Sequence, residues 1–187
     1  TYMMQQMSGR PSKRVIGTGT MLDTSRFRSL LGEYYEVDPR SVHGYILGEH
    51  GDSEFAAWST VTIGGKSPVR SAILGHHWNE ADMENLFLRV RNAAYEIIDG
   101  KGYTNWAIGL VIARLVSIIL DDRHSIQPVT SRLDGDYGIA DVCVSVPALV
   151  GMTGVQRLIH LNLEEAEQAA LEHSADLMKQ SIAGVEI

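Results

Sequence analysis

Hydrophobic residues recur at intervals of three and four positions in several segments of the chain, which is the period of one face of an α-helix. The clearest of these segments begins at Asp23, which stands where a helix N-cap belongs. Its apolar face is formed by Phe27, Leu30, Leu31 and Tyr34. We expect further helices over residues 80–98, about 105–120 and in the last segment, EEAEQAALEHSADLMKQSI. Residues 2–8 read as the end of a helix closed by Gly9 and Pro11.

Shorter apolar runs lie between the helices and predict strands. One strand candidate is SVHGYILG, which follows Pro39, and the next is EFAAWSTVTIGG. In the last third of the chain we expect strands at about 127–132, 139–146 and 155–163, with a turn at DGDYG. A short strand ending in a glycine loop is expected in KRVIGTG. The patterns together predict a fold of the mixed α and β class.

Composition limits the class of protein. The chain has 187 residues, of which 44% are hydrophobic and 21% charged, so it can bury a sizeable core as one domain or as two small ones. The longest apolar run, WAIGLVIARLVSIIL, is interrupted by Arg114 and falls short of the roughly 18 residues that a membrane span needs. A net charge of -7 argues against a general affinity for nucleic acid or acidic membranes, because phosphate binding needs clustered Lys and Arg.

Cysteine content and the first residues bear on the location of the protein. The only cysteine, Cys143, cannot form an internal disulfide, which favours a reduced, intracellular protein. The first residues, TYMMQQMSGRPSKR, lack the basic-then-apolar order of a secretion signal. We therefore expect a cytoplasmic protein.

The stretch LGEHGDS, residues 47–53, holds the histidine with the strongest case for chemistry. His50 stands between two acidic residues, in a segment cornered by glycines. An imidazole can give and take a proton near neutral pH if a carboxylate fixes its tautomer, and Asp23 is a candidate partner. The alternative is structural, with Asp23 capping its helix and His50 as a polar residue at a strand end. Spacing by itself leaves both interpretations open.

Arginines on the same helix add candidate binding groups. Arg26 lies three residues after Asp23, so both can face one site that would hold a carboxylate, an imidazole and a guanidinium. A guanidinium grips a carboxylate through two parallel hydrogen bonds. Arg28 is rotated by roughly 200° around the helix from Arg26 and must point elsewhere. One helix can therefore serve two separate anion sites.

Three motifs in their order along the chain, GTGTMLDTSRFR, VHGYILGEHGDSEF and IIDGKGYTNWAIG, resemble the L-lactate dehydrogenase family within the lactate/malate dehydrogenase superfamily. The resemblance extends over essentially the whole chain. It implies that His50 exchanges a proton with the substrate oxygen, that Asp23 is its carboxylate partner and that Arg26 binds the substrate carboxylate. The implied reaction is the reversible transfer of a hydride between NADH and pyruvate.

Further roles follow from the same resemblance. Thr104 matches a threonine near the substrate, Ile108 an apolar contact of the nicotinamide ring of NAD, and Thr18 a polar neighbour of its carboxamide. The structural alternative for Thr104 is an N-cap of the following helix, and both roles can hold at once. Arg28 and His43 match the pair that binds the activator fructose 1,6-bisphosphate across a subunit interface in allosteric bacterial enzymes. The resemblance also implies a homotetramer.

The resemblance implies an α/β fold in two parts. Residues 1–19 would be the end of the NAD-binding domain, with part of its doubly wound sheet, and residues 20–187 a substrate domain with antiparallel strands. The G-x-G-x-x-G turn that seats the pyrophosphate of NAD is not found, since GTGTML carries Leu22 in place of the third glycine. We therefore expect an incomplete chain that is inactive alone, with residues 1–19 and the helix 105–120 packing against the missing part.

Other interpretations stay open. Within the superfamily, the alternatives are a branched-chain 2-hydroxyacid dehydrogenase and a malate dehydrogenase. Outside it, the chain would be a non-catalytic fragment or regulatory subunit that binds a sugar phosphate through Arg28 and His43. A metal-dependent hydrolase would use His50 with His76 or His77, but these adjacent histidines project differently and no third ligand is suitably spaced. We expect no metal ion, no nucleic acid partner and no membrane partner.

Overall fold

The computed structural model describes residues 1–185. The helices are α1 (Tyr2–Ser8), α2 (Met21–Tyr34), α3 (Glu80–Lys101), α4 (Trp106–Leu120) and α5 (Glu165–Ala183). The strands are β1 (Val42–His43), β2 (Ile46–Leu47), β3 (Phe55–Ala56), β4 (Thr62–Ile63), β5 (Ser125–Asp134), β6 (Ala140–Gly151) and β7 (Gly154–Leu158). Every strand pair in the described range is antiparallel, so the expected α/β fold with antiparallel strands is confirmed. Residues 186–187, the end of the substrate domain expected over 20–187, lie outside that range.

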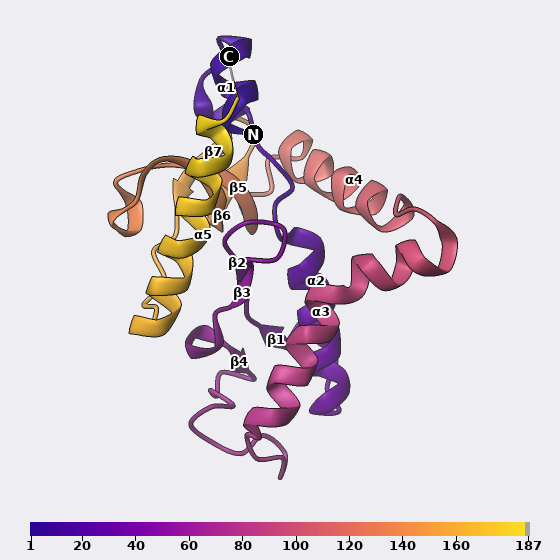
Figure 1. Ribbon diagram of the computed structural model, residues 1–187. Helices are drawn as coiled ribbons and strands as arrows, with labels where there is room; N and C mark the ends of the chain where they lie inside the picture. Colours follow the sequence, from indigo (N-terminus) through magenta and orange to yellow (C-terminus); the bar gives the residue numbers. More distant parts are fainter. Residues whose placement is uncertain (186–187) are drawn as a thin grey trace.

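The main sheet joins three strands in the order β5–β6–β7 (Figure 1). β5 and β6 pair over almost their whole length, which confirms the strands expected at 127–132 and 139–146 and extends both. β7 ends at Leu158, so the strand expected over 155–163 is too long. Beyond β7, the Tyr137 hydroxyl donates to the carbonyl of Ile159 at 2.8 Å and accepts from the N–H of Leu161 at 3.0 Å. The Tyr137 side chain therefore supports the segment after β7, where Ile159 still donates a backbone hydrogen bond to Pro147 of β6.

The segment SVHGYILG, expected as one strand, is divided into two short strands with different partners. β1 pairs with β4, whereas β2 pairs with β3. The division falls at Gly44, where an added Cβ would lie 3.1 Å from the ring of Phe27 in α2. The other expected strand, EFAAWSTVTIGG, is likewise interrupted by a 3-10 helix, Trp58–Thr60. Both predictions are therefore wrong about the continuity of the strand.

The prediction of a strand in KRVIGTG is wrong. Residues Ser12–Arg14 form a 3-10 turn after Pro11, and Gly17 makes only an isolated bridge to Thr130 of β5. The chain crosses the edge of the main sheet here instead of running along it. Gly19 has a φ of 51°, and a Cβ at this position would lie 2.8 Å from the backbone nitrogen of Thr130, so the crossing requires a glycine.

The helices agree better with the predictions. The helices expected over 2–8, 80–98 and 105–120 and in the last segment are confirmed as α1, α3, α4 and α5. α2 begins earlier than expected, with Thr20 at its N-cap position, so the prediction that Asp23 is the N-cap is wrong. Asp23 lies inside the first turn of α2, where its carboxylate makes contacts outside the helix.

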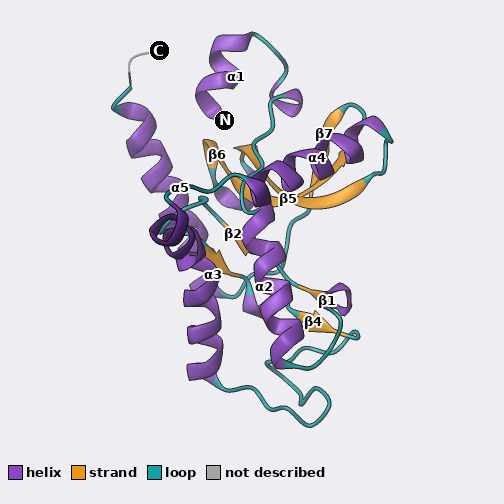
Figure 2. Ribbon diagram, turned by 90° about the vertical axis from the view of Figure 1, so that its right-hand side faces the viewer, coloured by secondary structure: helices purple, strands orange, loops and turns teal. Residues whose placement is uncertain are grey.

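Clusters of buried side chains hold these elements together. Phe27 and Leu31 of α2 pack with Met83 and Val90 of α3, and the two helices lie side by side in both views (Figures 1 and 2). α4 packs against the end of β6, whereas α5 packs against its beginning through Leu171. The start of α2 and the loop after β2 therefore lie where these clusters meet.

Apolar side chains remain exposed on two helices. Trp106, Leu110 and Leu120 of α4 are 76%, 74% and 75% exposed, and Met4 and Met7 of α1 are 58% and 69% exposed. These helices belong to the segments that we expected to pack against further chain, and that packing stays a prediction. None of the described helices combines the length and the apolar character needed to cross a lipid bilayer.

Candidate active site

The histidine loop, residues 48–54, follows β2 and carries His50. Its first residue, Gly48, forms paired backbone hydrogen bonds of 3.0 and 2.7 Å with Ser145 of β6. Gly48 has a φ of 92°, a left-handed value that glycine adopts without steric cost. The main sheet therefore determines where the loop begins.

Helix α5 holds the histidine loop through Ser174, which is fully buried. The Ser174 hydroxyl accepts a hydrogen bond from the N–H of Glu49 at 2.7 Å and lies 3.0 Å from the hydroxyl of Ser53. Ser53 in turn donates to the carboxylate of Glu49. A Cβ added at Gly48 would lie 2.7 Å from the Ser174 hydroxyl oxygen, so the loop and the helix are in close contact.

His50 forms an ion pair with Asp23 of α2. The Nδ1 atom of His50 lies 2.7 Å from Oδ2 of Asp23, whose side chain is 3% exposed. α2 is held in place because Thr20 donates to the carbonyl of Ile46 at 2.6 Å and the Ile46 N–H donates to Thr24 at 3.0 Å. The His50 side chain is 56% exposed, so Asp23 holds one ring nitrogen while much of the ring stays accessible.

The surroundings of His50 favour its charged form. Hydrogen bonding to Asp23, and then to Glu54, raises the pKa of His50 to about 10, against the opposing effect of burial. Glu54 Oε2 lies 3.9 Å from the same Nδ1 atom. His50 is therefore protonated at neutral pH, in the form that can donate a proton.

Arg26 and His50 face one pocket with a volume of about 150 Å³. Arg26 Nη1 also lies 3.5 Å from Asp23 Oδ1, so the arginine and the histidine share one carboxylate. Thr104 and Ile108 line the same pocket, just before α4 and near its start. The other lining residues are Gly19, Leu22, Ala94, Ile97, Asn105, Trp106 and Ala107. The structure thus brings four of the predicted site residues together.

Two predictions near this pocket have different outcomes. The N-cap of α4 is Asn105, whose side chain accepts a hydrogen bond from the N–H of Trp106, so the alternative of Thr104 as the N-cap is wrong. Thr18 is half-buried and does not line the pocket, although its neighbour Gly19 does. The contact of Thr18 with a nicotinamide carboxamide stays a prediction.

Arg28 makes its contacts away from this pocket, as its position on α2 predicts. Its Nε atom donates to the carbonyl of Gly44 at 3.0 Å, and its guanidinium lies 5.0 Å from the centre of the Tyr45 ring. His43 is exposed on β1 and directly precedes Gly44. Arg28 and His43 therefore belong to one region of the surface, separate from the pocket of His50.

Sequence reasoning missed two contributors to the site. Glu54 is 5% exposed and approaches His50, and Ser174 supports the histidine loop. A glutamate close to other acidic residues has the pattern of a solvated loop, and Ser174 lies within an amphipathic helix far along the chain. No local signal separates these residues from ordinary surface positions, because burial marks them and burial depends on distant segments.

Asp23, His50 and Glu54 are the one group of possible metal ligands among the described residues, with ligand atoms within 4.8 Å of one another. The 2.7 Å between His50 Nδ1 and Asp23 Oδ2 is a hydrogen-bonding distance. Two ligands of one tetrahedral zinc ion lie about 3.3 Å apart, so this ion pair would have to open to admit the ion. His76 and His77 do not belong to the group. A site without metal stays a prediction.

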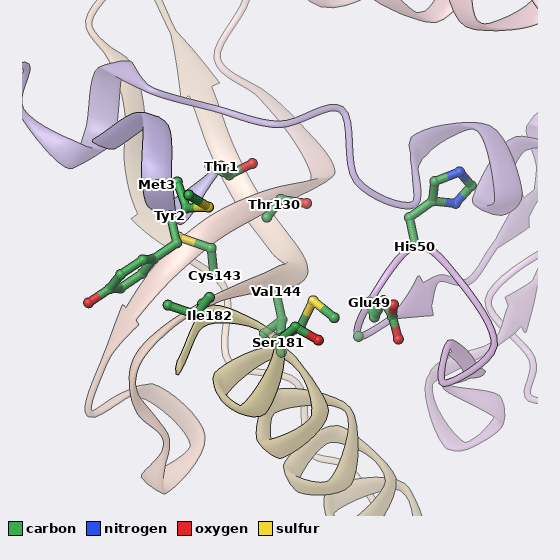
Figure 3. A pocket seen from close by; sticks show the side chains of 12 residues that line it. Thr1, Tyr2, Met3, Glu49, His50, Thr130, Cys143, Val144, Ser181 and Ile182 are labelled. Carbon is green, nitrogen blue, oxygen red and sulfur yellow. The ribbon is translucent and has the colours of Figure 1, made fainter. Parts of the chain in front are cut away.

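A second hollow, of about 330 Å³, lies between α1, β6 and the end of α5 (Figure 3). His50 lies at one end of it, apart from Tyr2 and Cys143 at the other. Burial raises the pKa of the Cys143 thiol to about 11, so this hollow offers no reactive thiolate near neutral pH. The chemistry therefore centres on His50 and the pocket that it shares with Arg26.

The fold and the pocket together define the class of protein. Residues 20–186 match the family described as lactate/malate dehydrogenase, alpha/beta C-terminal domain, and the chain belongs to this family. The resemblance that the three motifs indicated is therefore confirmed.

Within this family, the chain is similar to several proteins named L-lactate dehydrogenase. The L-lactate dehydrogenase of Salinibacter ruber is 52% identical over 187 residues, which are 100% of this chain and 59% of that protein. The L-lactate dehydrogenase of Priestia megaterium is 48% identical over 180 residues, which are 96% of this chain and 57% of that protein. The crystal structure of the minor L-lactate dehydrogenase of Enterococcus mundtii in its ligands-bound form superposes with a TM-score of 0.95 at 45% identity. That match covers 100% of this chain and 59% of the other, so the chain spans about three fifths of the length of these relatives.

Proposed function

We propose that the complete protein containing this chain is an NAD-dependent L-lactate dehydrogenase, which transfers a hydride reversibly between NADH and pyruvate. The observation that carries the proposal is the pocket shared by Arg26 and His50, with Asp23 paired to both side chains. A 2-oxo acid needs a cation for its carboxylate and a proton donor for its carbonyl oxygen. The pocket offers both groups, and relatives with this domain are named L-lactate dehydrogenases.

Arg26 binds the substrate carboxylate in this proposal. Its side chain is 19% exposed, so a salt bridge formed here is screened less by water than one on the open surface. The guanidinium has five N–H donors, and its contact with Asp23 at 3.5 Å occupies only one nitrogen. The remaining donors can form a two-pronged contact that fixes the orientation of a 2-oxo acid.

His50 supplies the proton. During reduction, negative charge develops on the carbonyl oxygen, and a protonated imidazole neutralises it as the new C–H bond forms. The Asp23 carboxylate orients the ring through Nδ1 and stabilises the imidazolium. In the reverse direction, the neutral ring takes the proton from the hydroxyl of lactate.

The pocket fits the nicotinamide end of the cofactor. Ile108 and Leu22 give it an apolar wall, which suits an uncharged reduced nicotinamide ring and keeps water away from the reacting atoms. Ile108 and Thr18 would contact this end of NAD, and NADH supplies the hydride when bound. The glycine turn for the pyrophosphate is not found in GTGTML, so the rest of the cofactor would bind to another part of the complete protein.

We propose a division of the chain between residues 1–19, the end of the NAD-binding domain, and residues 20–187, the substrate domain. The exposed apolar side chains of α4 and α1 support this division, because apolar patches on a protein surface mark contacts with other protein. The complete protein would be a cytoplasmic homotetramer that acts on a small 2-oxo or 2-hydroxy acid, without a nucleic acid or membrane partner.

A second site, for the activator fructose 1,6-bisphosphate, is proposed at Arg28 and His43. The supporting observation is that Arg28 bonds to the carbonyl of Gly44, which directly follows the exposed His43. A phosphate dianion between an arginine and a histidine would relieve repulsion between basic groups that face each other across a subunit interface. Binding of the activator would then favour assembly of the subunits.

The proposed reaction is tested by following NADH oxidation by the complete protein with pyruvate, oxaloacetate and a branched-chain 2-oxo acid. We expect the highest kcat/KM for pyruvate, and a loss of about 10²- to 10⁴-fold in His50→Asn with NADH binding retained. A preference for one of the other acids would assign the corresponding dehydrogenase instead. A folded protein that binds the sugar bisphosphate but turns over none of the three acids would overturn the proposal in favour of a non-catalytic protein.

A further inference from the structure

Glu54 is a buried carboxylate that the proposed reaction does not use. It ends the histidine loop directly before β3, and only 5% of it is exposed. One of its oxygens, Oε1, has no hydrogen-bond partner among the described residues. Burying a carboxylate without partners is costly unless a nearby charge balances it. Packing alone therefore does not explain a glutamate at this position.

The other oxygen of Glu54 faces the imidazole of His50. Oε2 lies 3.9 Å from Nδ1, the same nitrogen that Asp23 approaches to 2.7 Å. Nδ1 carries one proton, and the shorter distance places Asp23 closer to that proton than Glu54. Glu54 is therefore the more distant of the two carboxylates that act on Nδ1.

Two buried carboxylates with oxygens within 4.8 Å of each other repel, and a nearby cation stabilises their charged forms. Burial raises the pKa of Glu54, hydrogen bonding to His50 opposes that rise, and the charge of Asp23 adds to it. His50 Nδ1 lies 2.7 Å from Asp23 and 3.9 Å from Glu54, so the imidazolium is a cation close to both acids, whereas Arg26 contacts Asp23 at 3.5 Å. Loss of its proton would leave two like charges facing each other in a buried place.

We propose that Glu54 is a positioning residue, a second carboxylate that keeps His50 protonated and biases the pocket toward donating a proton to a 2-oxo acid. Asp23 orients the ring through its contact with Nδ1 at 2.7 Å, and Glu54 adds negative charge at 3.9 Å from the same atom. The consequence for turnover rests on the proposed function, whereas the effect of Glu54 on His50 needs no substrate.

Other charged groups lie near this part of the molecule, and of these Arg26 shares a partner with His50, because it contacts Asp23 at 3.5 Å. Among the described residues, only Asp23 and Glu54 place a carboxylate oxygen within 4.0 Å of a nitrogen of His50. The remaining groups near the loop are Arg26 on α2, Glu49 and Asp52 in the loop itself, Tyr95 on α3 and His173 on α5.

Two of these groups show that an acidic residue close to His50 in sequence need not contact its imidazole. The Glu49 carboxylate, one residue before His50, accepts a hydrogen bond from Ser53. Asp52 accepts one from Tyr95 at 3.2 Å. Glu49 therefore provides a control with the same charge in the same loop but with a different partner.

The test compares Glu54→Gln with Glu49→Gln in the complete protein. Removing an opposite charge at this distance lowers the pKa of His50 by about 1 unit or more. Pyruvate reduction, which needs protonated His50, should therefore decline at a correspondingly lower pH in Glu54→Gln. Lactate oxidation, which needs the neutral ring, should begin at a lower pH. Glu49→Gln should move both profiles less, because its amide can still accept the hydrogen bond from Ser53.

A second measurement reports on His50 without substrate. Diethyl pyrocarbonate modifies neutral imidazole. The modification seen in the wild type but not in His50→Asn belongs to His50, and the pH dependence of its rate gives the pKa of His50. We expect the same downward shift in Glu54→Gln as in the kinetic profiles. Thermal melting and NADH binding show whether each variant folds. If Glu54→Gln does not fold, Glu54→Asp replaces it, with a smaller shift in the same direction because its carboxylate is drawn back by one methylene.

The outcomes distinguish the role of Glu54 from the proposed reaction of the complete protein. An unchanged pKa of His50, or a shift no larger than that of Glu49→Gln, overturns the role of Glu54. If the complete protein never reduces pyruvate but the chemically measured pKa still falls when Glu54 is replaced, the proposed reaction is wrong and the inference about Glu54 holds.

Discussion

The imidazole of His50 and the carboxylate of Asp23 meet at 2.7 Å, although one lies in a loop after β2 and the other in the first turn of α2. Thr20, the N-cap of α2, donates to the carbonyl of Ile46, and the N–H of Ile46 donates to Thr24 of α2, which joins the helix to β2 directly before that loop. The distance between the two side chains is therefore set by the packing of regular elements. An imidazole held in this way keeps its orientation without relying on the loop alone.

Asp23→Asn should lower kcat for pyruvate reduction by about 10²- to 10⁴-fold in the complete protein. The amide keeps the size of the side chain but loses the charge that stabilises the imidazolium, so the pKa of His50 falls. Steady-state kinetics measure the loss, and NADH binding serves as the control because Asp23 lies behind His50. A kcat within a few-fold of the wild type would contradict the partnership.

The stability of the protein should depend on the proton of His50. The pKa of His50 is raised from 6.5 to about 10, chiefly by hydrogen bonding to Asp23. The folded state thus binds this proton more tightly, so the stabilisation is complete below pH 6.5 and is lost as pH rises through about 10. The effect is reduced by solvent, because 56% of the side chain is exposed. Urea unfolding midpoints of the wild type and His50→Gln should therefore converge as pH approaches 10; a constant difference would refute the linkage.

Arg26→Lys should chiefly raise KM for pyruvate. An ammonium carries the charge but lacks the fork that holds a carboxylate at two points, and a lost charge-assisted hydrogen bond costs about 1.5–3 kcal/mol, or roughly 10- to 100-fold in affinity. Arg40→Lys is the matched control, since Arg40 is exposed and pairs with Asp38. An unchanged KM in Arg26→Lys would remove Arg26 from the substrate site.

Arg28→Ala should abolish activation by fructose 1,6-bisphosphate while leaving fully activated turnover intact. Arg28 bonds to Gly44 away from the pocket of His50, so its loss should not disturb Asp23 or Arg26. Titrating the activator at low pyruvate measures the effect. Persistent activation in the variant would show that the activator binds elsewhere.

Ser174→Ala should lower kcat more than it changes KM, because the histidine loop loses the acceptor for the N–H of Glu49. A part-buried donor left without a partner costs about 1 kcal/mol, which thermal unfolding should also detect. Ser181→Ala is the matched control on the same helix, since its hydroxyl donates only to the carbonyl of Leu177 and is exposed. Equal effects of the two substitutions would mean that Ser174 contributes only to the stability of α5.

The helices could be predicted from the sequence because their signal is local. A period of three to four residues, with Asn79 before α3 and a long apolar run in α4, places them to within a few residues. The short strands around His43 and Ile46 could not be predicted in the same way. Their lengths depend on which distant strand each one meets, and the chain changes partners at Gly44.

In the candidate site, too, some features follow from local sequence and others depend on contacts between distant segments. The sequence by itself determined the chemical groups, since His50, Asp23 and Arg26 stand in motifs whose order indicates the lactate/malate dehydrogenase family. Only the tertiary structure decided that Glu54 is buried beside His50 and that Ser174, from the last helix, holds the loop. Burial and the electric field at a side chain are sums over neighbours from distant segments, and those neighbours are known only once the chain has folded.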